Sequence, residues 1–138
     1  MIESNFKEFY EKVLGLIGDW HVTFVEQDDE HKEMHIHVEY KNQYGYHHCP
    51  ICGYPSKLHD HRVRQIRHLD TCEYKTFINV HLPRVECPFH NFQQEKVPFA
   101  DGRSHYTKSF ENHVIGLLLD GTPVLTVANN LGLSLGSH

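Results

Sequence analysis

Apolar residues near the N-terminus recur at helical spacing over residues 4–16, with lysines and glutamates between them. Positions three or four residues apart share one face of a helix, so we predict an amphipathic helix that ends near Gly15 or Gly18. Residues 20–26 are rich in aromatic and β-branched side chains, and residues 34–40 alternate between apolar and polar. These two stretches predict strands joined by an acidic turn, so the chain opens with a helix and a β-hairpin.

A second hairpin is predicted in the middle of the chain, from residues 59–69 and 74–86. Alternation puts four side chains of its second strand on one face: Thr76, Ile78, Val80 and Leu82. Pro83 has no backbone N–H, so it predicts an edge position or a break in that strand. Residues 91–106 are polar and irregular, and they predict a connector to a helical tail.

The last third of the chain shows two helical patterns in succession. Thr107 is a candidate N-cap for a helix that ends at Asp120-Gly121, and Thr122-Pro123 gives a second start signal. Gly132-Leu133-Ser134 then follows with the spacing of the turn and cap in a helix-turn-helix. We expect the first two helices of that motif but not the recognition helix, because the sequence ends four residues later. The alternative is a helical hairpin that only packs on the β module.

Two short motifs place pairs of soft ligands two residues apart. They are Cys49-Pro50-Ile51-Cys52 and Cys87-Pro88-Phe89-His90, and residues 53–86 separate them. A tight turn with this spacing aims both side chains at one metal ion, and zinc favours four tetrahedral thiolate and imidazole ligands. We therefore predict one structural zinc ion, bound by Cys49, Cys52, Cys87 and His90.

Other ligands compete with this set. Cys72 could replace His90 as the fourth ligand, but it falls in the turn at the far end of the predicted hairpin. His47 and His48 also lie close in sequence, directly before the first cysteine. Because they stand next to Cys49, their side chains are poorly placed to bind the same ion as that cysteine. We therefore interpret them as flanking residues.

A redox pair is a different interpretation of Cys49 and Cys52. Such a pair usually lies at the start of a helix, whose N-terminus lowers the thiol pKa. Gly53 and Pro55 disfavour a helix there. Disulfide bonds are disfavoured as well, because no signal peptide precedes the four cysteines.

Charge is distributed unevenly along the 138 residues, whose net charge is −5. Residues 1–43 carry −6, residues 44–108 carry +3 and residues 109–138 carry −2. The segment with the zinc motifs is therefore the basic one, which is weak evidence for a nucleic-acid partner. No apolar run approaches the length of a membrane span.

Three arginines of the first middle strand are candidates for phosphate contact. Extended backbone puts Arg62 and Arg64 on one face and Arg67 on the other. The planar donors of arginine match phosphate oxygens, which favours DNA binding. A solvated strand face with ion pairs to Asp60 or Asp70 is the alternative.

Several of these segments together match a known family pattern. In order they are Cys49-Pro50-Ile51-Cys52-Gly53, His59-Asp60-His61-Arg62, Arg64-Gln65-Ile66-Arg67-His68-Leu69-Asp70, Leu82-Pro83-Arg84-Val85-Glu86-Cys87-Pro88-Phe89-His90, Val97-Pro98-Phe99-Ala100, Phe110-Glu111 and Leu131-Gly132-Leu133-Ser134. From about residue 45 onward the chain resembles the N-terminal region of a bacterial transposase of the ISL3 insertion-sequence family. The resemblance implies a cytoplasmic zinc head that recognises the terminal inverted repeats of the element in double-stranded DNA. The sequence is also compatible with a homo-oligomer. The family's catalytic domain would follow the end of this chain, so we expect binding without catalysis.

The sequence predicts an α+β fold with three parts. Residues 1–43 form a helix and β-hairpin, residues 44–103 a zinc-ribbon-like β module, and residues 104–138 a helical tail with a partial helix-turn-helix. The favoured function is a DNA-binding transposase head. The alternatives are a zinc-stapled protein-interaction module and, less favoured, a thiol oxidoreductase that uses its Cys-Xaa-Xaa-Cys motif.

Overall fold

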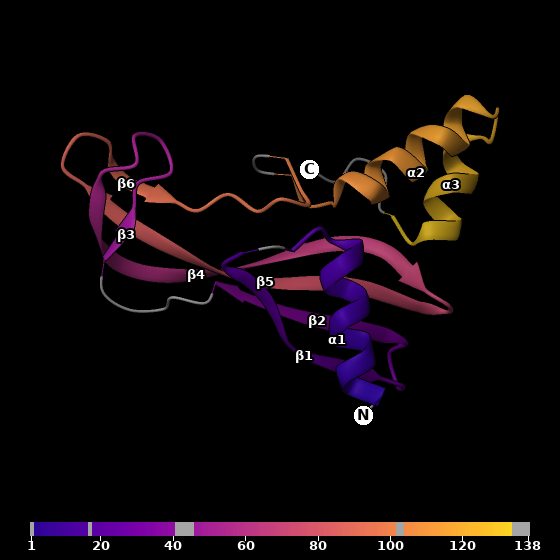
Figure 1. The fold of residues 1–138 in the computed structure, drawn as a ribbon. Helices are drawn as coiled ribbons and strands as arrows, with labels where there is room; N and C mark the ends of the chain where they lie inside the picture. The colour runs from indigo at the N-terminus through magenta and orange to yellow at the C-terminus, as the bar shows by residue number, and fades with distance from the viewer. Residues whose placement is uncertain (1, 17, 41–45, 102–103, 134–138) are drawn as a thin grey trace.

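The fold is a curled, strand-rich sheet with helices at both ends of the chain (Figure 1). The computed structural model describes residues 2–16, 18–40, 46–101 and 104–133. The elements are α1 (Ile2–Val13), β1 (Trp20–Asp28), β2 (Glu33–Tyr40), β3 (Tyr46–His48), β4 (Pro55–Thr71), β5 (Tyr74–Cys87), β6 (Asn91–Gln94), α2 (Lys108–Leu119) and α3 (Val124–Leu131). The predicted helix, the two hairpins and the two tail helices are all present, with ends shifted by a few residues.

All six described strands belong to one sheet. Its order is β1-β2-β5-β4-β3, and β6 also pairs with β5. The β2 and β5 strands are parallel, whereas the other pairs are antiparallel. The N-terminal hairpin and the middle of the chain therefore share a sheet across the boundary predicted at residue 43. The division into three domains stays a prediction.

One face of this sheet forms the hydrophobic core. Its fully buried side chains come from β2, β4 and β5, and they are Ile36, Val38, Ile66, Ile78, Val80 and Leu82. Tyr10 of α1 and Leu14, directly after that helix, pack against them, and the connector before α2 adds Val97 and Phe99. Burial of a large aliphatic side chain contributes about 1.5–3 kcal/mol, so this face holds the long β4–β5 hairpin in place. The predicted alternation of β5 is confirmed.

Strand β5 does not break at Pro83, contrary to one of the two outcomes that its proline predicted. On the side of β5 away from β4, pairing with β2 ends at His81 and pairing with β6 begins at Arg84. Pro83 thus lies in the gap between two neighbouring strands, where a missing N–H donor disrupts no ladder. The same pairing corrects the prediction for residues 91–106, because Asn91–Gln94 is a strand and only the remainder is irregular.

The helical tail begins as predicted. The Thr107 hydroxyl accepts a hydrogen bond of 3.1 Å from the N–H of Phe110 and so caps α2. The second start differs, since Pro123 and not Thr122 occupies the N-cap of α3 and makes no side-chain cap. Gly132 ends α3 in the left-handed conformation, with φ of 68°. The sequence predicts no recognition helix, and residues 134–138, where such a helix would begin, lie outside the described part of the chain.

Candidate metal centre and nucleic-acid interface

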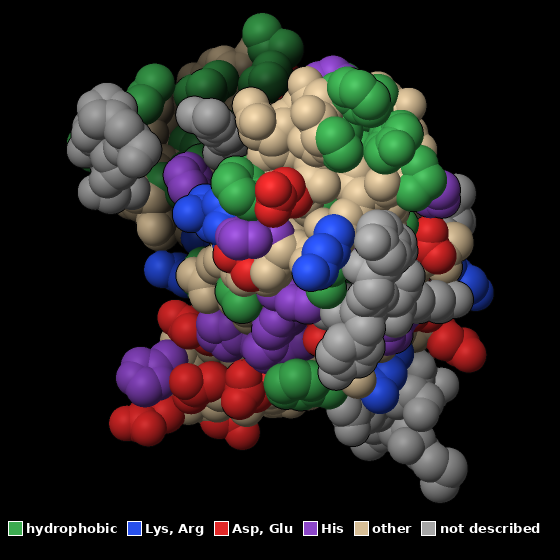
Figure 2. Space-filling model, turned by 90° about the vertical axis from the view of Figure 1, so that its left-hand side faces the viewer, with side chains coloured by type: hydrophobic (Ala, Val, Ile, Leu, Met, Phe, Trp, Pro, Cys, Tyr) green, Lys and Arg blue, Asp and Glu red, His purple; other side chains and the backbone are tan. Residues whose placement is uncertain are grey.

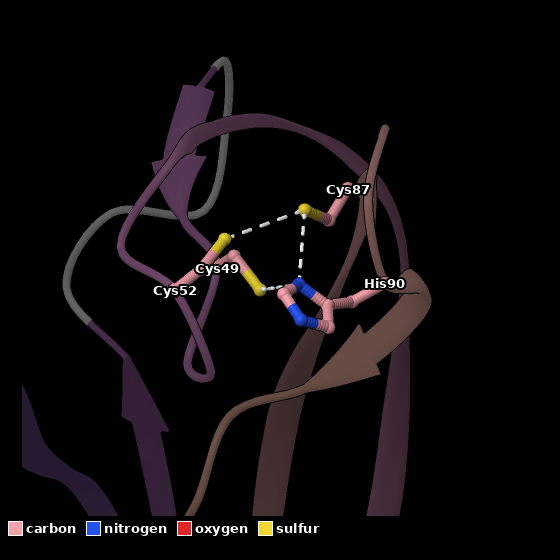
Figure 3. Close-up of side chains that lie close together, drawn as sticks. All are labelled: Cys49, Cys52, Cys87 and His90. Atoms are coloured by element: carbon pink, nitrogen blue, oxygen red, sulfur yellow. Dashed lines mark hydrogen bonds between the residues drawn. The ribbon is translucent and has the colours of Figure 1, made fainter.

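Two hairpin turns at one end of the sheet face each other and carry the predicted zinc ligands (Figure 3). The turn between β3 and β4 holds Cys49 and Cys52. Cys87 is the last residue of β5, and His90 lies in the turn that follows it before β6. Because β4 and β5 pair along most of their length, the two turns are held side by side. Residues 35 or more positions apart in sequence thereby meet at one point.

The donor atoms have the separation that a zinc ion requires. All four lie within 4.8 Å of one another. The Cys52 and Cys87 sulfurs are 3.7 Å apart, and Nδ1 of His90 is 3.7 Å from Cys87 Sγ and 3.9 Å from Cys49 Sγ. With zinc–sulfur bonds of about 2.3 Å, ligands at the corners of a tetrahedron are about 3.7 Å apart. The cluster therefore fits structural Zn²⁺.

Backbone hydrogen bonds give the two turns the same local form. The N–H of Ile51 donates to Cys49 Sγ, and the N–H of Phe89 donates to Cys87 Sγ, both at 3.4 Å. The first turn closes through Gly53, whose N–H donates to the Cys49 carbonyl and whose φ is 76°. A left-handed residue is needed there, which explains a glycine directly after the second cysteine.

Hydrogen bonding also prepares one thiol to bind a cation. Burial acts to raise the pKa of Cys87, but hydrogen bonds from the Phe89 N–H and from His90 lower it to about 6. For Cys52 the N–H of Tyr54 favours the thiolate, but burial and the neighbouring thiols outweigh it and raise the pKa. A metal ion would stabilise the additional thiolates, since binding of zinc releases protons from its ligands.

The competing ligands lie outside the cluster. Cys72 is in the β4–β5 turn, at the opposite end of the long hairpin, and it is exposed. His48 turns its Nδ1 toward the Gly53 carbonyl at 3.0 Å, and His47 is buried against the ring of Tyr40.

The environment of Cys49 and Cys52 also differs from that of a redox pair. A turn follows Cys52, and β4 begins at Pro55 without a helix. This described segment therefore has no helix N-terminus beside Cys49 and Cys52, which is the feature that lowers the pKa of a redox thiol.

The three predicted arginines have different surroundings. Arg62 is exposed on β4. Arg64, on the same face, is half-buried and donates a hydrogen bond to the carbonyl of Ser104. Arg67 is only 7% exposed, so little of its side chain faces solvent. Which of them contacts DNA stays a prediction.

Arg67 connects the sheet to the helical tail. Its guanidinium donates to Asp70 at 2.7 Å and to the Leu131 carbonyl, at the end of α3, at 3.0 Å. It also lies over the rings of Phe77 and Phe110, with its central carbon 5.6 and 5.1 Å from the two centroids. Arg67 thus ties β4, β5, α2 and α3 together.

Two family models match the chain in adjacent segments. Residues 45–90 match the zinc-finger of transposase IS204/IS1001/IS1096/IS1165, and residues 95–134 match the helix-turn-helix domain of transposase family ISL3. The chain carries the N-terminal zinc-binding and DNA-binding region of an ISL3-family transposase. No curated protein and no solved structure matches it. We call residues 45–134 the transposase head.

The matches cover binding domains, with no catalytic domain found beside them. They bear out the predicted family and its zinc and DNA-binding character. None of the helices in the described ranges is long and apolar enough to cross a membrane.

The end of the transposase head that carries β3 and β6 is mixed in character (Figure 2). Apolar side chains gather at its upper edge, Lys, Arg and His side chains lie across the middle, and acidic side chains lie mainly below. This matches the sequence, in which residues 1–43 carry −6 and residues 44–108 carry +3.

Sequence reasoning missed two residues beside the predicted arginines. Arg84 of β5 and Phe92 of β6 line the same hollow as Arg62 and Arg64. Only the pairing of β5 with β4 on one side and β6 on the other brings them there. A single alternating pattern cannot show such a neighbourhood.

Proposed function

We propose that the transposase head binds the terminal inverted repeats of an insertion sequence as duplex DNA in the bacterial cytoplasm. The observation that carries the proposal is the succession of a zinc-ribbon match and a helix-turn-helix match in one chain. In this proposal residues 44–103 form the zinc-bound part and residues 104–138 the helical part of the binding surface.

The zinc ion has a structural role in this proposal. Its ligands are Cys49, Cys52, Cys87 and the Nδ1 atom of His90, whose donor atoms lie within 4.8 Å of one another. Four protein ligands leave no coordination position for water, so the site does not activate a nucleophile. The ion instead holds the β3–β4 and β5–β6 turns together and fixes the end of the hairpin that carries the arginines.

Arg62 and Arg64 contact DNA phosphates, and Arg67 orients the helix-turn-helix. Exposure of Arg62 and the basic character of its segment support the first role. The hydrogen bond from Arg67 to the Leu131 carbonyl supports the second, because Leu131 ends the helix that precedes the motif's turn. Holding that helix against the sheet sets the angle between the zinc-bound residues 44–103 and the helical residues 104–138.

A protein-interaction module and a thiol oxidoreductase remain alternatives from the sequence, and neither gains support from the matched families. We propose binding without strand transfer for these residues.

The test is a titration of zinc-loaded protein with DNA fragments from the two ends of the element that encodes it. A matched internal fragment of equal length is the control, and each is measured at about 50 and 200 mM salt. Tighter binding to the end fragments is expected, together with a steep loss of affinity at the higher salt. Equal binding to end and internal fragments would reject repeat recognition, and no binding at all would reject the DNA-binding role.

A further inference from the structure

A hollow of about 820 Å³ lies where β4, β5 and β6 meet the connector to α2. Its lining residues are Arg62, Val63, Arg64, Arg84, Phe92, Gln94 and His105. The strand pairing explains the convergence, because Arg84 pairs with Asp60 on β4 and with Gln94 on β6. Three strands thus contribute side chains to one concave surface.

The hollow is positively charged within an acidic protein. Among the described residues that line it, three are arginines and none carries a carboxylate. Asp60, opposite Arg84 on β4, accepts two hydrogen bonds of 2.8 and 2.6 Å from the Arg84 guanidinium. This pair holds the Arg84 guanidinium in place, while Arg62 is exposed. A concave surface with one sign of charge concentrates anions, phosphate groups among them.

The hollow also contains an aromatic surface. The Phe92 side chain is 49% exposed although it is large and apolar. The Arg84 guanidinium lies 5.6 Å from its ring centroid, and the His59 ring lies 4.5 Å away. An exposed ring beside arginines is the combination that proteins use to hold unpaired bases, with phosphates on the cations and bases stacked on the ring.

The dimensions favour a single strand over a duplex. A hollow of this size is in the range of sites that hold one small molecule, so it admits one or a few nucleotides. Paired bases are stacked inside the double helix, and a duplex cannot bring a ring face and a phosphate into the same hollow. We propose that this hollow binds unpaired, single-stranded DNA nucleotides, at a site that shares Arg62 and Arg64 with the proposed duplex-binding surface and adds the ring of Phe92. The inference rests on the proposed DNA-binding function and adds a second form of DNA to it.

The same geometry links the hollow to the zinc centre. Strand β6 begins at Asn91, directly after the ligand His90, and pairs with β5 only over Arg84–Cys87. Phe92 is therefore two residues from a zinc ligand, and the metal fixes the wall that carries the ring.

The experiment measures, by fluorescence anisotropy, how tightly the protein binds a labelled single strand of twelve thymidine nucleotides and a labelled blunt duplex. The variants are Phe92→Ala and, as a matched control, Phe89→Ala. Phe89 is a more exposed phenylalanine, at 69%, and it does not line the hollow. Zinc content and melting curves establish that each variant is folded. Phe92→Ala should weaken binding of the single strand about fivefold or more and leave duplex binding unchanged. Phe89→Ala should change neither.

The outcomes separate this inference from the proposed function. If the wild-type protein binds the duplex but not the single strand, the inference fails and the proposed function stands. The inference also fails if the Phe92 and Phe89 variants bind the single strand as well as the wild type does. If the protein binds neither DNA, the proposed function fails, and this inference fails with it.

Discussion

Replacement of Arg67 by methionine distinguishes a structural role from a role in DNA contact. Methionine keeps most of the side-chain volume between the rings of Phe77 and Phe110, but it removes the charge and the donors. The lost interactions are the 2.7 Å ion pair with Asp70 and the 3.0 Å hydrogen bond to the Leu131 carbonyl.

The size of the effect follows from these contacts. A hydrogen bond to a charged group contributes about 1.5–3 kcal/mol. Asp70 is about one-third exposed, with 31% of its side chain accessible, so water can hydrate its carboxylate once Arg67 is gone. The free energy lost with that ion pair is therefore at the lower end of this range. We expect Arg67→Met to lower the free energy of unfolding by about 2–4 kcal/mol. In a domain of this size that corresponds to a fall of roughly 10 °C in Tm.

The assay combines urea unfolding with duplex binding at several salt concentrations, and Arg62→Met is the matched control. Arg62 is exposed, so its replacement should change stability by no more than about 0.5 kcal/mol and lower the salt slope of DNA binding by about 0.9. The Arg67→Met variant should be less stable than the wild type. Measured well below its melting temperature, it should keep the wild-type salt slope of DNA binding. A variant with wild-type stability and a salt slope lower by about one would refute this reasoning, because Arg67 would then be a phosphate contact.

Three further outcomes are expected. Cys52→Ser should lose the zinc ion in elemental analysis, whereas Cys72→Ser should keep it, because Cys72 lies at the opposite end of the β4–β5 hairpin; zinc loss in the second variant but not the first would show that the ligand set is wrong. His68 is 3% exposed and burial lowers its pKa to about 4 from 6.5, so the folded state resists its protonation. The contribution of His68 to stability should therefore be complete above pH 6.5 and decrease by about 3 kcal/mol as the pH falls toward 4, and His68→Asn should remove that part of the pH dependence in acid titrations of unfolding; an unchanged profile would contradict the assignment. Thr107→Ala should cost about 2 kcal/mol in urea unfolding, because it removes both the α2 cap and the 2.8 Å hydrogen bond between the Thr107 hydroxyl and Nδ1 of buried His68. A change below about 0.3 kcal/mol would show that these two hydrogen bonds contribute little.

Much of the metal centre could be predicted from the sequence because its information is local. Two ligands two residues apart already specify a turn, and Gly53 supplies the left-handed residue that the first turn needs. The hairpin that brings the turns together is also local, since β4 and β5 are consecutive strands with strong alternation.

The surroundings of the arginines could not be predicted in this way. Whether a polar side chain on a strand is exposed depends on what covers that strand, and Arg67 is covered by Phe110 and Leu131, more than forty positions later. The parallel pairing of β2 with β5 is similarly non-local. It accounts for a single sheet where alternation alone predicted two separate hairpins.

Duplex binding by the same protein before and after removal of its metal tests most directly whether zinc supports DNA recognition. We expect one zinc per chain, loss of end-fragment binding on chelation, and recovery when zinc is added back, because the ion holds the turns that fix the arginine-bearing hairpin. Metal-free protein that keeps its fold and binds the end fragments with unchanged affinity would contradict this expectation.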